Sequence, residues 1–237
     1  MMETLVETHN LSAGYQGQAV IANLNLNVKK GEIVALLGTN GVGKTTTLMT
    51  LAGTLPPVDG EVSLFGIETK RPLYRRVREG LGFISDRRSL IRKLSVRDNL
   101  RLQGGSVEAA LSIFPELADH LGRPAGLLSG GQQQMLTVAR CLASQPHLLL
   151  VDELSLGLAP LIVKRLLATL RSAADNGLGV LLVEQHVSQA LSISDRGYVL
   201  GRGKVQLEGS ARELRQQGTD IEAAYLQGET LREKTIK

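Results

Sequence analysis

The chain has 237 residues, of which 43% are hydrophobic and 21% are charged, and its net charge is +4. This length and composition are ordinary for a globular protein with a sizeable core. No apolar run approaches the ~20 residues of a transmembrane helix, and the N-terminus lacks the basic-then-apolar layout of a signal peptide, so we expect a cytoplasmic protein. The single cysteine, Cys141, excludes an internal disulfide and a cysteine-based zinc site.

The chain begins with segments that predict a small antiparallel β subdomain. Strands are predicted over residues 5–11 and 24–28, and the second alternates apolar and polar residues as a half-buried antiparallel strand does. A turn with a lone aromatic residue, Tyr15, separates them. A further short strand is predicted over residues 61–65, after a turn rich in proline and glycine.

A glycine-rich loop joins a buried strand predicted over residues 33–37 to a helix predicted over residues 46–52. It satisfies the pattern of two glycines around four free positions followed by Lys and Thr, which binds nucleoside triphosphates. The glycines let backbone N–H groups point at phosphates, and the helix N-terminus adds a positive dipole end. Lys44 would reach the β- and γ-phosphates, and the Thr45 hydroxyl would bind Mg²⁺. The residues that we predict to bind the nucleotide here are Gly38, Thr39, Asn40, Gly41, Val42, Gly43, Lys44, Thr45 and Thr46.

Residues 85–144 differ in character from the flanking sequence and predict an inserted helical subdomain. Near its end, a helix predicted over residues 130–143 follows Ser129, which can cap it, and begins with two glycines that leave its first N–H groups accessible. A single nucleotide needs only one phosphate loop, so this second anion site indicates a second copy of the chain. Head-to-tail pairing would let each copy supply the same four residues to the other's nucleotide: Ser129, Gly130, Gly131 and Gln132.

Two further buried strands are predicted over residues 147–152 and 179–183, and they alternate with helices. This alternation predicts a parallel sheet flanked by helices, in which ligands bind at the carboxyl ends of the strands. Gly38, Asp152 and Glu184 all follow strand ends and can therefore share one site. We expect Asp152 to hold Mg²⁺ through water and Glu153 to polarise the attacking water.

The order of phosphate loop, Leu-Ser-Gly-Gly-Gln at residues 128–132, acidic strand end and downstream His186 resembles the ATP-binding subunits of ABC transporters. The resemblance covers nearly the whole chain. It implies a P-loop NTPase fold in one domain, with residues 1–84 and 145–237 forming the α/β core and β subdomain. It also implies a dimer that closes on ATP, opens after hydrolysis, and drives transmembrane permease subunits.

The resemblance assigns roles by matching position. Tyr15 would stack on adenine, Glu153 would be the general base, and His186 would be the switch residue near the γ-phosphate, with Lys44 also in the catalytic set. Asp86 stands where the family usually has Gln, less often Glu, and its shorter side chain would reach Mg²⁺ through water.

The closer resemblance is to subunits that power branched-chain amino acid importers, through the sequences at residues 155–160 and 182–185 and the region 83–100. It implies uptake of branched-chain or related amino acids, a second ATP-binding subunit in a homo- or heterodimer, and an indirect solute-binding partner. The chain would then be peripheral on the inner face of the cell membrane, and no nucleic-acid partner is expected.

Four alternatives remain at this point. They are an ABC ATPase of another transporter, for another solute or for export; a soluble ABC ATPase without a membrane role; a GTPase or small-molecule kinase that shares only the phosphate loop; and a non-hydrolysing binding module. The absence of an Asn-Lys-x-Asp signature argues against a GTPase, and the presence of Glu153 and His186 argues against a non-hydrolysing module.

Overall fold

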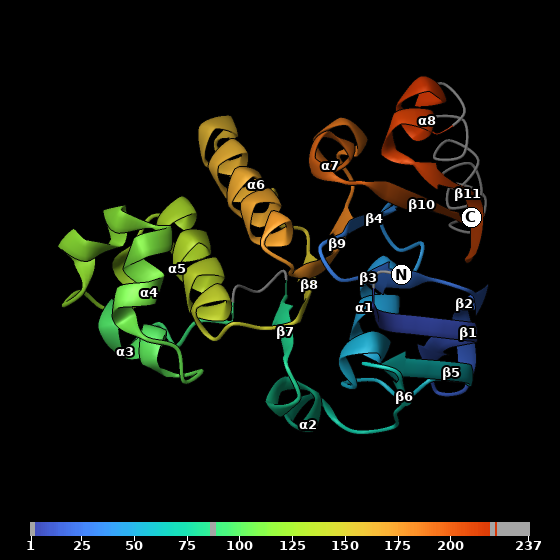
Figure 1. Cartoon of the computed structure of the whole chain (residues 1–237), viewed down its shortest axis with the longest axis horizontal. Helices are drawn as coiled ribbons and strands as arrows, with labels where there is room; N and C mark the ends of the chain where they lie inside the picture. Colours follow the sequence, from blue (N-terminus) through green and yellow to red (C-terminus); the bar gives the residue numbers. More distant parts are fainter. Residues whose placement is uncertain (1–2, 86–88, 219–220, 222–237) are drawn as a thin grey trace, which may run out of the picture.

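The computed structural model describes residues 3–85, 89–218 and 221. Its centre is a six-stranded sheet in the order β11-β10-β4-β9-β8-β7 (Figure 1). Neighbouring strands in this sheet are parallel except for the edge strand β11, which pairs antiparallel with β10. The strands are β4 (Ile33–Leu37), β7 (Leu81–Ile84), β8 (Leu148–Asp152), β9 (Gly179–Glu184), β10 (Arg196–Gly201) and β11 (Lys204–Ser210).

A second, antiparallel sheet has the order β2-β1-β5-β6, with β3 also paired to β1. The single strand predicted over residues 24–28 is instead the end of one strand and the start of another. Side chains interrupt the ladder there, because the Thr8 hydroxyl accepts from the Leu26 N–H at 2.9 Å and the Asn25 side chain accepts from the Asn10 N–H at 2.8 Å. The strands are β1 (Thr4–Tyr15), β2 (Gln18–Leu24), β3 (Asn27–Lys29), β5 (Asp59–Leu64) and β6 (Ile67–Glu68).

Helices cover the parallel sheet, and a group of them forms a lobe at one side of the molecule (Figure 1). The helices next to the sheets are α1 (Lys44–Ala52), α2 (Leu73–Arg78), α6 (Pro160–Asp175), α7 (Val187–Ile193) and α8 (Ala211–Gln216). The helical lobe contains α3 (Val96–Arg101), α4 (Val107–Ile113), the 3-10 helices η1 (Pro115–His120) and η2 (Ala125–Leu127), and α5 (Gly130–Ala143). This mixture of a parallel sheet, an antiparallel sheet and inserted helices confirms the predicted fold class.

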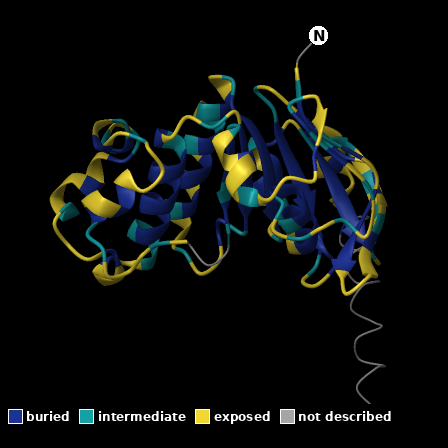
Figure 2. Ribbon diagram, turned by 90° about the horizontal axis from the view of Figure 1, so that it is seen from below, coloured by how far each residue is buried: buried dark blue, intermediate teal, exposed yellow. Residues whose placement is uncertain are grey.

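The parallel sheet is buried on both faces, which explains its uninterrupted apolar strands. In β4, Ile33, Ala35 and Leu37 face one core cluster, which continues into the helical lobe. Val34 and Leu36 face the other cluster, where α1 packs between the two sheets. Buried residues therefore run through both the sheets and the helical lobe, and exposed residues lie on the outer surfaces (Figure 2).

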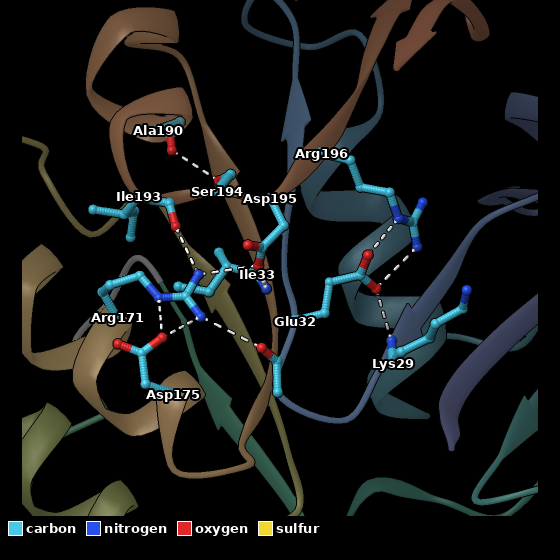
Figure 3. Close-up of polar contacts among 11 residues, drawn as sticks. Lys29, Glu32, Ile33, Arg171, Asp175, Ala190, Ile193, Ser194, Asp195 and Arg196 are labelled. Carbon is cyan, nitrogen blue, oxygen red and sulfur yellow. Dashed lines mark hydrogen bonds and ion pairs between the residues drawn. The ribbon is translucent and has the colours of Figure 1, made fainter. Parts of the chain in front are cut away.

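Charged side chains join the elements at the amino end of the parallel sheet (Figure 3). Arg196 at the start of β10 donates from Nε to Glu32 Oε1 at 2.6 Å, and the Lys29 N–H donates to Glu32 Oε2 at 2.9 Å. Arg171 of α6 donates to Asp195 Oδ2 at 3.0 Å, and the same oxygen accepts from the Ile33 N–H at 2.8 Å. These bonds hold β3, β4, β10 and α6 together at the end of the sheet opposite the strand carboxyl ends.

Replacing Arg196 with Met should destabilise the fold by about 2 kcal/mol, because the Glu32 side chain is only 14% exposed and would keep its charge without a cationic partner. Urea unfolding would measure this free energy. The matched control is Lys164→Met on the exposed side of α6, for which we expect a change of no more than ~0.5 kcal/mol. Equal stability of the two variants would contradict the role of the Arg196–Glu32 pair.

Candidate active site

The phosphate loop lies between the carboxyl end of β4 and the first turn of α1. Gly43 has φ 110°, and a Cβ added there would lie 2.4 Å from Ile21 Cγ1, so the loop requires glycine at this position. Gly43 is also the N-cap residue of α1, and no side chain caps the helix. The first N–H groups of α1 therefore point into the loop without a side-chain acceptor, as a site for a phosphate requires.

Lys44 is buried beneath this loop, with only 4% of the residue exposed. Its Nζ donates to the Gly38 carbonyl at 2.8 Å and the Thr39 carbonyl at 3.0 Å. Burial lowers the pKa of Lys44, while the nearby carboxylates of Glu153 and Asp152 act in the opposite direction. Phosphate oxygens would offer the ammonium group stronger acceptors than these two neutral carbonyls.

The carboxylates predicted to bind Mg²⁺ (Asp152) and to act as general base (Glu153) lie at the carboxyl end of β8. Asp152 is the last residue of the strand and is 2% exposed. Glu153 follows with φ 47°, a conformation that is unusual for a residue with a side chain, and its N–H donates to the Val183 carbonyl at 3.0 Å. Of the carboxylates that oppose the lowering of the Lys44 pKa, Glu153 has the largest effect, so Glu153 and the phosphate loop belong to one electrostatic site.

Two residues without a predicted role, Glu184 and Gln185, also belong to this site. The Gln185 Nε2 donates to Glu153 Oε1 at 2.6 Å. Glu184 is 2% exposed and accepts from both the Ser155 N–H (3.0 Å) and the Ser155 hydroxyl (2.9 Å). Burial raises the pKa of Glu184, although these hydrogen bonds act in the opposite direction. The position of Glu184 at the end of a predicted strand already indicated that it shares the site, and the same signal could have been used for Gln185, the next residue.

The Leu-Ser-Gly-Gly-Gln motif begins α5 in the helical lobe. The Ser129 Oγ accepts from the Gln132 N–H at 3.3 Å, and the Gln132 Oε1 accepts from the Ser129 N–H at 2.9 Å, which completes a capping box. Among the described residues, no hydrogen bond joins Ser129–Gln132 to the phosphate loop. The assignment of these residues to a nucleotide held by another subunit stays a prediction.

Three other predicted residues are placed as follows. Tyr15 ends β1 at the tip of a hairpin, paired with Gln18, and is 48% exposed. His186 is exposed at the N-cap position of α7 and makes no side-chain capping bond there. Asp86 lies outside the described residues, so its predicted contact with Mg²⁺ stays a prediction.

The residues present suit a magnesium ion carried by a nucleotide. Mg²⁺ in such sites keeps several waters and takes only one or two protein ligands besides phosphate oxygens. The described part of the chain holds no cluster of three or more His, Cys, Asp or Glu side chains that could bind a metal unaided. Asp152 at the end of β8 and the exposed Thr45 in the first turn of α1 are donors of the required kind and number.

A family model described as "ABC transporter" matches residues 6–155, which include the phosphate loop, the Ser129 motif, and Asp152 and Glu153. The chain belongs to this family. It is an ABC ATPase subunit, and the family's ATP-binding domains hydrolyse ATP. None of the helices in the described part of the chain has the length and apolar character that crossing a membrane requires.

Similar proteins match over nearly their whole lengths. One is the high-affinity branched-chain amino acid transport ATP-binding protein BraG of Pseudomonas aeruginosa, which is 36% identical over 228 residues, covering 92% of this chain and 97% of that protein. The lipopolysaccharide export system ATP-binding protein LptB of Escherichia coli is 34% identical, covering 94% and 97%. An ATP-binding cassette solved as a dimer bound to ADP and phosphate has a TM-score of 0.79 at 26% identity, covering 88% of this chain and 99% of that one.

Replacing Tyr15 with Ala should weaken equilibrium ATP binding about tenfold, because stacking of a base on an aromatic ring contributes roughly 1–3 kcal/mol. Isothermal titration calorimetry with ATP would measure the affinity. Tyr15→Phe keeps the ring and should bind like the unchanged chain, and Tyr74→Ala removes another exposed tyrosine as a control. Unchanged affinity in Tyr15→Ala would refute adenine stacking on this residue.

Proposed function

We propose that this chain is the ATP-hydrolysing subunit of a transporter that takes up a small solute, with branched-chain or related amino acids as the solute class. The observation that carries the proposal is the 36% identity to BraG over nearly the full length of both proteins. A protein of Archaeoglobus fulgidus named as a probable branched-chain amino acid transport ATP-binding protein, LivF, is 34% identical and supports the same class. The similarity to LptB, named for lipopolysaccharide export, makes export of another solute the alternative.

The phosphate loop would hold the triphosphate through its backbone and Lys44. In this binding step, the Lys44 Nζ exchanges the Gly38 and Thr39 carbonyls for phosphate oxygens. Thr45 and Asp152 would hold Mg²⁺, which, when bound, offsets charge on the phosphate oxygens. The burial of Lys44 strengthens its interaction with the phosphates because little water competes there.

Hydrolysis would use Glu153 as the general base. The water oxygen forms a bond to the γ-phosphorus as the bond to the ADP oxygen breaks, and the water proton passes to the Glu153 carboxylate. Lys44 stabilises the negative charge of the transferred phosphoryl group. His186, from its position at the start of α7, would approach the γ-phosphate after closure of the site.

The site would be completed by a second ATP-binding subunit, either another copy or a related chain. Its Ser129, Gly130, Gly131 and Gln132 would supply the N-terminal N–H groups of α5 to the nucleotide held by Lys44. The partners would be transmembrane permease subunits and, indirectly, a solute-binding protein, with the chain peripheral on the inner membrane face. The similarity to a dimeric cassette bound to ADP and phosphate supports the pairing.

The solute class can be tested by uptake of labelled leucine, isoleucine and valine in cells that make the Glu153→Gln chain in place of the natural one. Loss of this uptake, with uptake of an unrelated sugar unchanged, is the expected result. Normal uptake of all three amino acids would show that the chain does not power their transport and that the solute belongs to another class.

Replacing Glu153 with Gln should lower kcat by at least ~100-fold while ATP affinity changes little, because the amide cannot accept the water proton. ATP should then accumulate in a stable dimer, which size-exclusion chromatography with light scattering would detect. The matched control is Glu68→Gln, an exposed carboxylate of β6. Hydrolysis by Glu153→Gln at the normal rate would rule out the general-base assignment.

If Lys44 and Ser129 act in the same site from different subunits, the ATPase rate per subunit should fall on dilution. Lys44→Ala and Ser129→Arg chains should each be inactive, and their mixture should regain activity, because a head-to-tail mixed dimer has one intact site. A rate per subunit that stays flat on dilution, from a chain that light scattering finds monomeric, would contradict the shared site.

A further inference from the structure

A histidine of the helical lobe contacts the Ser129 motif. His120 is the last residue of η1, and its imidazole Nε2 lies 2.8 Å from the Gln132 side-chain Nε2. We propose that His120 is a positioning residue for the Ser129 motif, which it orients through Gln132 toward the nucleotide held by the other subunit. This inference rests on the proposed pairing of two ATP-binding subunits, and it gives a role to a residue outside the motif.

The capping box of α5 fixes which atom donates in this contact. The Ser129 backbone N–H can only donate, so the Gln132 side-chain atom that lies 2.9 Å from it must be the amide oxygen. The amide nitrogen of Gln132 therefore faces His120, and it offers only N–H donors. The His120 Nε2 must then accept, which requires a neutral imidazole with its proton on Nδ1.

The Gln132 amide is thereby held at both of its polar atoms. Its oxygen accepts from the Ser129 N–H, and its nitrogen donates to the half-buried His120 ring. The other bond of the capping box, from the Gln132 N–H to the Ser129 Oγ, is longer at 3.3 Å. Because a free glutamine side chain has many rotamers, the bond to His120 helps to keep the capping box closed.

The closed capping box leaves the first N–H groups of α5 directed away from the helix. The first four N–H groups of a helix have no acceptor within it. Ser129 accepts from one of them, that of Gln132, and the N–H groups of Gly130 and Gly131 come before it at the helix end. Side chains that are already ordered lower the entropic cost of association, so a fixed Gln132 favours closure of two subunits on a nucleotide.

The segment that carries His120 is anchored to α6, which also contacts α5. Arg165 of α6 pairs with Glu116 of η1 at 3.8 Å and donates to the Ile113 carbonyl at 3.4 Å. Its guanidinium carbon also lies 5.6 Å from the centre of the ring of Phe114, which is fully buried directly before η1. These contacts hold η1 in place beside the start of α5, so His120 can orient Gln132 from a fixed position.

The decisive variant is His120→Phe, which keeps an aromatic ring and removes the acceptor. We expect kcat for ATP hydrolysis to fall about 5- to 10-fold, the effect of losing one hydrogen bond, while the ATP affinity of the separate subunit stays within about twofold because the Lys44 loop is unchanged. His120→Gln should recover most of kcat, because its amide oxygen can accept at nearly the reach of the imidazole Nε2. His9→Phe, at an exposed histidine of β1, is the matched control.

Dimer closure gives a second measurement that does not depend on turnover. In a Glu153→Gln background, light scattering over a dilution series would give the dissociation constant of the ATP-bound dimer. His120→Phe should raise this constant at least ~5-fold, because each dimer contains two such contacts. An unchanged dissociation constant would contradict a role in closure.

Mixing of variant chains separates a defect in the Ser129 motif from a defect in the whole fold. A Lys44→Ala chain keeps an intact motif, so adding it should raise the ATPase rate per His120→Phe subunit several-fold. A Ser129→Arg chain supplies no working motif, so adding it should leave that rate unchanged. In the first mixture, the phosphate loop of the His120→Phe chain meets an intact motif, whereas in the second it does not.

Normal kcat in His120→Phe would overturn the proposal. So would a fall in kcat that His120→Gln does not recover, or the absence of any gain on mixing with Lys44→Ala, since either result would indicate a general loss of structure. Failure of the proposed function is distinguishable. The unchanged chain would then not hydrolyse ATP, or the Lys44→Ala and Ser129→Arg chains would not regain activity when mixed with each other.

Discussion

The in-register pairing of three parallel strands is the constraint on which the site depends. Leu37 of β4 pairs with Glu184 of β9, and Asp152 of β8 pairs with Val183 of β9, so the three strands end at the same edge of the sheet. The residues of the candidate active site lie at or directly after these strand ends. The phosphate loop follows β4, Glu153 follows β8, and Gln185 comes directly after the end of β9. A slip of one residue in either pairing would turn every side chain of that strand to the opposite face and separate these groups.

Burial shifts the pKa values of two charged residues at this edge of the sheet. Both faces of the parallel sheet are covered, so Lys44 and Glu184 sit in surroundings that penalise charge. The pKa of Lys44 is lowered and that of Glu184 is raised for this same reason. Each is held by specific partners: two loop carbonyls for the lysine, and the Ser155 N–H and hydroxyl for the glutamate. The site is therefore preorganised, with donors and acceptors directed before any nucleotide enters.

The strands and the phosphate loop of the α/β core could be predicted because each depends on a clear pattern of neighbouring residues. The buried strands β4, β8 and β9 are unbroken apolar runs, and the phosphate loop has a spacing that few other structures require. The strand break within residues 24–28 was not predicted, because it depends on contacts with β1: the Thr8 hydroxyl accepts from the Leu26 N–H, and the Asn10 N–H donates to the Asn25 side chain. Such contacts join residues distant in sequence and leave no periodic signal.

The sequence by itself determined the fold class, the phosphate loop, the acidic strand end and the family, since these depend on residue types at short, fixed spacings. Only the tertiary structure decided which side chain contacts the Glu153 carboxylate. Glu184, Gln185 and His186 are consecutive, and a sequence pattern cannot say which of three neighbours turns toward β8. The strand register and the burial of Glu184 decide it, because they hold the Glu184 carboxylate on Ser155 and leave the Gln185 amide facing the base.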